Sequence, residues 1–164
     1  MTLFAKPLIT ERPDEVALRD INSSYSWAEV DDTLNRFVNG LLELDLGPDV
    51  RIAIFAENSA RAALAHVGGV IAGVSVVPIS FHLTAEEVAY ILNDSNARVL
   101  FVDGATAERG VEASAQSEVH ATIGWDAVEL PGLTAWDAWL AGSSPAEPPT
   151  DMMPRPNLLY TSGT

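Results

Sequence analysis

The stretch that decides the fold runs from residue 74 to residue 103 and holds three segments: "VSVVPI" (74–79), "AEEVAYILNDS" (85–95) and "RVLFVD" (98–103). The first and last segments are short, apolar and rich in β-branched residues, as buried strands are. Between them, Thr84 and Glu87 have the spacing of a capping box, and Leu83 can pack on Val88 as a hydrophobic staple, so a helix is predicted. This order of strand, helix and strand indicates a parallel βαβ crossover.

The same alternation continues on both sides of this unit. Upstream, "VRIAIF" (50–55) is a predicted strand, and Asn58-Ser59 can cap a helix through "ARAALAHVGGVIAG" (60–73). Downstream, a weaker helix is predicted at about residues 105–116 and a strand in "HATIGW" (120–125). The predicted strands are apolar throughout rather than alternating, which is expected where helices cover both faces of a sheet.

The two ends of this region carry smaller elements. Two runs, "EVALRD" (15–20) and "SSYSW" (23–27), flank Ile21-Asn22 and predict a small hairpin. Ser26 and Glu29 then form a capping box for a helix that Gly47-Pro48 ends. Near the other end, Thr134 and Asp137 have cap spacing before a short helix, "TAWDAWLAG". We predict a doubly wound α/β fold, with a mainly parallel sheet, helices on both faces and a small N-terminal hairpin.

Net charge, apolar runs and the cysteine count exclude several classes of partner and site. The formal net charge of −14 repels nucleic acid and anionic lipid, so no nucleic-acid partner is expected. No apolar run approaches the roughly 18 residues of a membrane-spanning helix. The chain has no cysteine, which excludes disulfides, thiolate nucleophiles and cysteine zinc sites. Without a signal-peptide pattern at its start, the chain is predicted to be cytoplasmic. Its basic residues are almost all arginine, a skew that suggests a bacterial genome rich in GC.

The last part of the chain changes character. Residues 142–157 hold five prolines and cannot form a regular helix or a central strand. We therefore divide the chain into an α/β subdomain (1–141), a proline-rich connector (142–157) and a strand that leads into a loop (158–164). The closing "YTSGT" offers backbone N–H groups, a glycine and hydroxyls, which a phosphate-binding loop requires. Taken alone, this pattern also describes many ordinary turns.

The wider context resembles the adenylate-forming superfamily, which contains acyl-CoA synthetases, peptide-synthetase adenylation domains and luciferases. The phosphate-loop motif of that family runs Y-T-S-G-T-T-G-x-P-K-G, and the chain supplies its first five residues at positions 160–164. The resemblance extends to "YSWAEVDDTLNRFVNGLLELDLGPDVRIAIFAENS" and to "AGVSVVPISFHLTAEEVAYILNDSNARVLFVD", the second being closest to the fatty-acyl-CoA synthetase branch.

The resemblance implies a function for the whole enzyme. It implies that Thr161, Ser162, Gly163 and Thr164 hold ATP phosphates, that Mg²⁺ offsets their charge, and that a fatty or related carboxylic acid is activated. Coenzyme A or a carrier-protein pantetheine would be the thiol acceptor. The rest of the motif, the ribose-binding aspartate and the adenylation lysine are not among the 164 residues. We therefore assign no catalytic residue and expect this chain alone to be inactive, with an exposed docking surface that would favour a homodimer.

The remaining candidates have simpler interpretations. His66, His82 and His120 are too scattered to predict a metal site. Gly68, Gly69 and Gly73 lack G-x-G-x-x-G spacing and fall in a predicted helix, so close helix packing is favoured over dinucleotide binding. Gly104 follows a predicted strand, but "GATAERG" also lacks the glycine spacing. The tryptophans at 125, 136 and 139 are interpreted as packing residues. Two alternatives to a ligase stay open: a partner-binding α/β module (or short relative) without catalysis, and a flavodoxin-like nucleotide-binding domain.

Overall fold

A parallel sheet forms the centre of the molecule. The computed structural model describes residues 6–47, 49, 51–127, 129–149 and 151–161. Within these residues the sheet has five strands in the order β4-β3-β5-β6-β7, and every neighbouring pair is parallel. The strands are β3 (Arg51–Phe55), β4 (Ser75–Ile79), β5 (Ala97–Asp103), β6 (Ala121–Trp125) and β7 (Leu133–Ala135). The chain thus begins the sheet at β3, adds β4 on one side and continues on the other, as in a doubly wound fold.

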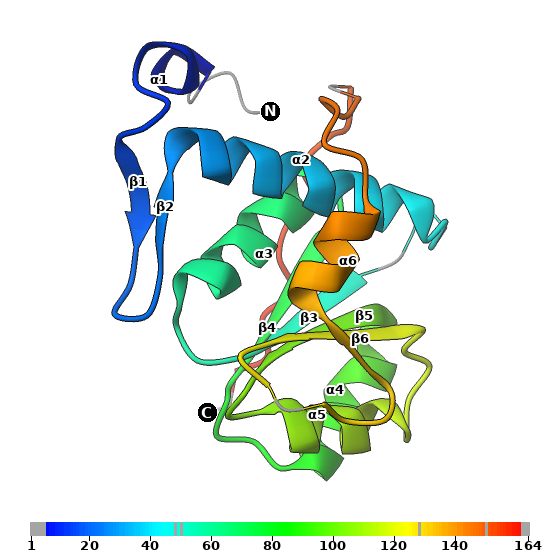
Figure 1. Ribbon diagram of the computed structural model, residues 1–164. Coiled ribbons are helices and arrows are strands. Elements are labelled where there is room, and N and C mark those ends of the chain that lie inside the picture. The colour runs from blue at the N-terminus through cyan, green and yellow to red at the C-terminus, as the bar shows by residue number, and fades with distance from the viewer. Residues whose placement is uncertain (1–5, 48, 50, 128, 150, 162–164) are drawn as a thin grey trace.

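Helices cover both faces of the sheet (Figure 1). The helices are α2 (Trp27–Glu43), α3 (Ala60–Ile71), α4 (Ala85–Asp94), α5 (Ala107–Ser114) and α6 (Trp136–Gly142). Side chains of α2, α3 and α6 pack on one face with Ile52 and Ile54, and side chains of α4 and α5 pack on the other with Ala53 and Phe55. Successive residues of β3 therefore enter opposite cores, which explains why the strand is apolar throughout.

Local sequence signals set the starts of three helices, α2, α3 and α4. Ser26 caps α2 and Thr84 caps α4, each in a complete capping box with the predicted glutamate. Ser59 caps α3 by accepting from the Ala62 amide, as predicted. The N-terminal hairpin is also confirmed: β1 (Val16–Arg19) pairs with β2 (Ser24–Ser26) in antiparallel fashion. It packs on α2 and α3 through a small apolar cluster that includes Tyr25.

Gly68 and the tryptophans at 125 and 136 have the packing roles that the sequence predicted, whereas Gly73 lies after α3 with φ +68° and approaches Met153 rather than another helix. A Cβ on Gly68 would lie 2.3 Å from Cδ1 of Phe37, so only glycine lets α3 approach α2 this closely. Trp136 is 2% exposed, and its ring centroid lies 5.4 Å from that of Trp125 and 5.7 Å from that of Phe37. These rings fill the space between the sheet and its helical cover.

Three features differ from the sequence predictions. Thr134 does not cap α6, because residues 133–135 form strand β7 beside β6 and Ala135 occupies the cap position without a side-chain hydrogen bond. A short helix, α1 (Lys6–Glu11), lies before the hairpin and was not predicted. The strand expected from residue 158 is not formed over residues 158–161, since this segment makes a single backbone hydrogen bond to β4 rather than a ladder.

Candidate functional site

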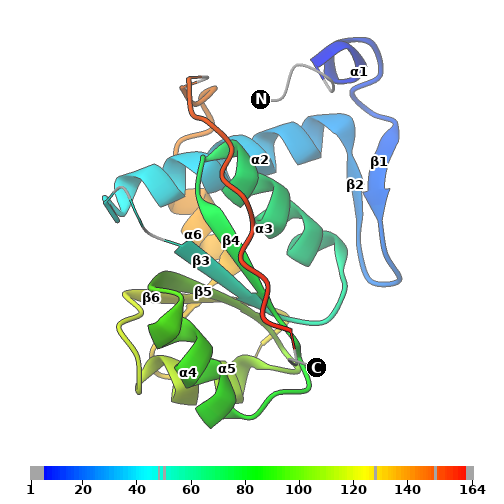
Figure 2. The same ribbon diagram turned by 180° about the vertical axis from the view of Figure 1, so that it is seen from behind.

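The C-terminal strap, residues 151–161, follows the edge strand β4 from one end to the other (Figure 2). Near the start of β4, Ser75 Oγ donates a hydrogen bond of 2.6 Å to the Pro156 carbonyl oxygen. Further along, the Leu158 amide donates to the Val76 carbonyl oxygen at 3.0 Å. Tyr160 and Thr161 then lie beside Pro78, Ile79 and Ser80. The strap therefore runs parallel to β4 and reaches the carboxyl edge of the sheet.

The sequence of β4 explains why an irregular segment can lie there. Pro78 has no N–H to donate, so it suits an edge strand and interrupts any ladder on its free side. At the amino end, Gly73 has φ +68°, and a Cβ there would lie 3.0 Å from the Met153 carbonyl oxygen. Glycine thus lets the strap approach closely before β4 begins. The path of the strap along β4 places Thr161 at the carboxyl edge of the sheet, where open α/β sheets bind ligands.

Of the four predicted phosphate-binding residues, the structure describes Thr161. Its side chain is exposed at the carboxyl end of β4. Ser162, Gly163 and Thr164 lie outside the described residues, so their phosphate-binding role stays a prediction. An open groove of about 580 Å³ adjoins Thr161. It is lined by Pro78, Ile79, Ser80, Leu83, Glu86, Glu87, Tyr90, Ile91, Tyr160 and Thr161.

The charge of this groove does not suit a triphosphate. Glu86 and Glu87 both line it, and no lysine or arginine is among its lining residues. The pKa of Glu87 is lowered by hydrogen bonds from the Thr84 backbone and side chain, so this carboxylate stays charged. Two carboxylates repel phosphate, and a neighbouring phosphate site would need a cation to offset them. In the described part of the chain, no group of three or more His, Cys, Asp or Glu could hold a metal ion.

The switch point of the sheet, between the carboxyl ends of β3 and β5, is filled by the protein itself. Asp103 is 7% exposed, and its Oδ2 accepts a hydrogen bond of 2.7 Å from the Glu57 amide. Its Oδ1 accepts from the Thr106 amide at 3.0 Å. The Thr106 hydroxyl donates to the Phe55 carbonyl oxygen and joins the two loops. Sequence reasoning missed Asp103, because its partner at Glu57 is 46 residues away.

A partly buried arginine, Arg109, supports the loop after β4. Arg109 Nη1 donates to the carbonyl oxygens of Phe81 (2.9 Å) and Leu83 (2.6 Å). Its guanidinium carbon lies 5.1 Å from the centroid of the Phe55 ring, a cation–π distance. Leu83 lines the groove beside Thr161, so Arg109 fixes one of its walls. No sequence signal marked Arg109, because it acts through backbone oxygens of another loop.

The three histidines do not come together. His66 Nε2 lies 3.1 Å from Asn157 Nδ2 and so contacts the strap. The His82 ring stacks near Phe81, with 4.0 Å between ring centroids. His120 precedes β6, where its amide donates to the Arg98 carbonyl oxygen. None of these contacts resembles a metal-binding or nucleophilic arrangement.

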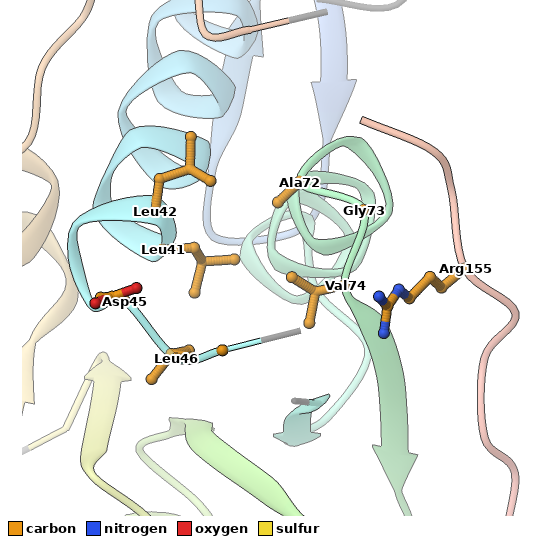
Figure 3. Close-up of a pocket in the computed structure, with 9 residues that line it drawn as sticks. Leu41, Leu42, Asp45, Leu46, Ala72, Gly73, Val74 and Arg155 are labelled. Atoms are coloured by element: carbon orange, nitrogen blue, oxygen red, sulfur yellow. The ribbon is translucent and has the colours of Figure 1, made fainter. Parts of the chain in front are cut away.

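A second hollow lies at the opposite end of β4, where Val74 and Ala72 lead into the strand (Figure 3). It measures about 300 Å³, and leucines at the end of α2 form one of its walls. Arg155 extends from the strap toward it and pairs with Asp49, with 3.6 Å between Nη1 and Oδ1. This hollow is separate from the Thr161 groove and contains no predicted site residue.

Comparisons with known proteins agree with this geometry. The sequence model of the AMP-binding enzyme family matches residues 8–164. Tyrocidine synthase 3 of Brevibacillus parabrevis is 32% identical over 95% of the chain, which spans 2% of that protein. A 3-[(3aS,4S,7aS)-7a-methyl-1,5-dioxo-octahydro-1H-inden-4-yl]propanoyl:CoA ligase of Mycobacterium tuberculosis is 30% identical over 96% of the chain, which spans 33% of the ligase.

Solved structures give the same result. The N-terminal domain of FACL13 from Mycobacterium tuberculosis matches with a TM-score of 0.77 at 25% identity, over 98% of the chain and 40% of that structure. An anthranilate CoA ligase, AuaEII, shares the fold at a TM-score of 0.80 and 21% identity, over 97% of the chain and 31% of its own. The described part of the chain contains no helix that is long and apolar enough to cross a membrane. The chain belongs to the AMP-binding, adenylate-forming enzyme family, and its fold is that of the N-terminal portion of these enzymes.

Proposed function

We propose that the chain is the N-terminal part of an ATP-dependent ligase that activates a carboxylic acid and transfers it to a thiol. The observation that carries the proposal is the family match over residues 8–164. The chain spans 33% of one CoA ligase that it matches, so the activity would belong to a polypeptide about three times longer. By itself the 164-residue chain is expected to be inactive.

The reaction solves a problem of electrophilicity. A carboxylate resists attack because its negative charge is delocalised and its leaving group would be oxide. In the proposed first step, a carboxylate oxygen attacks the α-phosphorus of ATP, and the bond to the β-phosphate breaks to release pyrophosphate and acyl-AMP. In the second step a thiolate attacks the acyl carbon, and AMP leaves with its electron pair. Preorganised donors around the phosphates would supply most of the stabilisation.

Thr161, Ser162, Gly163 and Thr164 would begin the cradle for the β- and γ-phosphates. The position of Thr161 at the carboxyl edge of the sheet supports this role. A bound Mg²⁺ would supply positive charge to offset the phosphates. Because Glu86 and Glu87 line the adjoining groove, we infer that further positive charge comes from residues outside this chain, such as the lysine of the family's loop motif.

The acid substrate and the acceptor thiol are proposed at a coarser level. The resemblance of residues 72–103 to fatty-acyl-CoA synthetases favours a fatty acid as substrate and coenzyme A as acceptor. A cytoplasmic location in a bacterium stays a proposal, supported by the absence of cysteine and the excess of arginine over lysine. The similarity to tyrocidine synthase 3 supports a second candidate, in which a carrier-protein pantetheine is the acceptor. Comparing coenzyme A with a pantetheinylated carrier protein as acceptor would separate the two.

The test is carboxylate-dependent exchange between ATP and labelled pyrophosphate. We expect exchange with a panel of fatty acids when the coding sequence is extended through a complete phosphate loop and the later segments, and none with residues 1–164 alone. Exchange by the short chain would refute its predicted inactivity. A stop codon directly after Thr164, or no exchange with any acid by the extended protein, would refute the ligase and favour a partner-binding module.

A further inference from the structure

Tyr160, directly before the proposed phosphate loop, makes a contact with a distant part of the chain. Its hydroxyl donates a hydrogen bond of 2.5 Å to Oδ2 of Asp94, across 66 residues of sequence. Its ring packs on the core cluster between the sheet and α4. Ring and hydroxyl together fix the side chain at two points, one residue before Thr161. The earlier strap contacts, at Pro156 and Leu158, hold backbone that lies further from the loop.

The location of Asp94 has no explanation from helix stability. Asp94 is the last residue of α4, and no basic residue stands in the last turn of that helix. Negative charge is unfavourable at a helix C-terminus because the carbonyl ends of the peptide dipoles point there. A hydrogen bond from a tyrosine hydroxyl offsets part of this cost. The 2.5 Å separation is typical of an O–H donor bound to a charged acceptor.

We propose that Asp94 is a positioning residue for nucleotide binding: through the Tyr160 hydroxyl it fixes the start of the phosphate loop at the carboxyl end of β4. This proposal rests on the proposed function. Partial burial and the Asp94 hydrogen bond raise the pKa of Tyr160 to about 12, so its hydroxyl keeps the donated proton at neutral pH. Asp94 touches neither nucleotide nor acid, and acts only through the position of Thr161.

The experiment compares four variants of the full-length ligase with the native enzyme: Tyr160→Phe, Asp94→Ala, Asp94→Asn and the Tyr160→Phe/Asp94→Ala double variant. The loop binds phosphates before and during the reaction, so its displacement weakens both states and raises KM for MgATP more than it lowers kcat. We expect Tyr160→Phe and Asp94→Ala each to raise this KM by about three-fold or more. Asp94→Asn keeps an acceptor oxygen and should raise it less. The double variant should match the worse single variant, because both remove one contact.

Asp45→Asn is the matched control. Asp45 follows the C-terminus of α2 with φ 44°, a conformation that asparagine tolerates, and its removal changes the net charge by the same amount. Its KM for MgATP should equal that of the native enzyme. A merely structural role for the Tyr160–Asp94 contact would lower kcat through loss of folded enzyme and leave KM unchanged, and that result would overturn the proposal.

Hydrogen exchange gives a second readout that does not depend on activity. Amides in the peptide containing Leu158–Thr161 should exchange faster in Tyr160→Phe and Asp94→Ala than in the native protein or in Asp45→Asn. Unchanged exchange in this peptide would refute the positioning role whatever the kinetics. If the native extended protein shows no carboxylate-dependent exchange between ATP and pyrophosphate, the proposed function is refuted instead. Amide hydrogen exchange would still decide whether Asp94 fixes the strap.

Discussion

At the scale of single residues, Asp20 connects the N-terminal hairpin to helix α3. Its Oδ2 accepts a hydrogen bond of 2.7 Å from the Ala60 amide, at the first turn of α3. Its Oδ1 accepts from the Asn22 and Ser23 amides within the hairpin turn. These bonds, that from Ala60 foremost, lower the pKa of Asp20 from 3.8 to about 2. The folded protein therefore stabilises the charged carboxylate of Asp20 relative to its protonated form.

This pKa shift predicts how stability depends on pH. A lowered folded-state pKa contributes stability that is fully present above pH 3.8 and is lost as the pH falls through about 2. Asp20→Asn should therefore lower the urea midpoint of unfolding at pH 7 and flatten its dependence on pH between about 4 and 2. Urea titrations at a series of pH values measure both effects.

The control is Asp14→Asn, which removes an exposed carboxylate from the same end of the chain. Its urea midpoint should stay close to the native value, with the native dependence on pH. If Asp20→Asn and the native protein lose stability in parallel between pH 4 and pH 2, Asp20 does not have the role assigned to it.

The same residues show what the sequence can and cannot predict. The capping boxes at Ser26 and Thr84 join residues three positions apart, so the pattern is visible in the sequence. Asp20 and Ala60 are 40 positions apart, and Asp103 and Glu57 are 46 apart. Contacts of this kind appear only when the chain has folded, since no local pattern marks a side chain that binds a distant backbone group.

At the scale of elements, long apolar strands were predictable and the short edge strand β7 was not. β3 and β5 are buried on both faces, as is β4 except at the exposed Pro78, and all three keep apolar runs. β7 has three residues, two of them exposed, so its sequence resembles a helix start rather than a strand. For the candidate site, the motif predicts which residues bind phosphate, and that role stays a prediction, whereas the position of the strap beside β4 depends on tertiary contacts that no local pattern marks.

The loop after β4 gives a prediction at this scale. Arg109 Nη1 donates hydrogen bonds to two carbonyl oxygens of this loop, those of Phe81 and Leu83. The guanidinium group lies over the Phe55 ring. Lysine cannot reproduce this planar, stacked geometry, so Arg109→Lys should cost about 1–2 kcal/mol in the free energy of unfolding. Hydrogen exchange of residues 81–84 should accelerate, because the loop loses its anchor.

A second arginine serves as the comparison for this variant. Arg155 forms a surface ion pair with Asp49, and Arg155→Lys should change stability by about 0–1 kcal/mol. Equal effects of the two substitutions, measured by urea unfolding, would show that the stacked geometry at Arg109 contributes nothing beyond its charge.

At the scale of the whole molecule, the two ends of the edge strand β4 differ in their surroundings. Near the amino end, the strap is held at Ser75 and passes over Gly73. At the carboxyl end, the switch point is filled by Asp103, while Thr161 reaches solvent beside an acidic groove. The strap therefore both closes the sheet edge and directs the chain toward the proposed site.

Because the strap lies along β4, removing it should lower the free energy of unfolding. Met152 packs on one core cluster, and Leu158 and Tyr160 pack on the other. A chain ending at residue 149 should lose about 2–4 kcal/mol of unfolding free energy, as estimated for three half-buried apolar side chains. Its uncovered edge strand should also pair with other copies, because free N–H and C=O groups of an edge strand invite association. Urea unfolding and light scattering measure the two effects.

A version that keeps its full length but carries serine at positions 152, 158 and 160 separates apolar contact from simple coverage. The three substitutions remove the packing and leave the backbone, including the bond from the residue 158 amide to the Val76 carbonyl oxygen. We expect this version to lose most of the stability that truncation removes, yet to associate less, because its strap can still lie along β4. A truncated chain that stays monomeric and unfolds at the native urea midpoint would show that β4 does not depend on the strap.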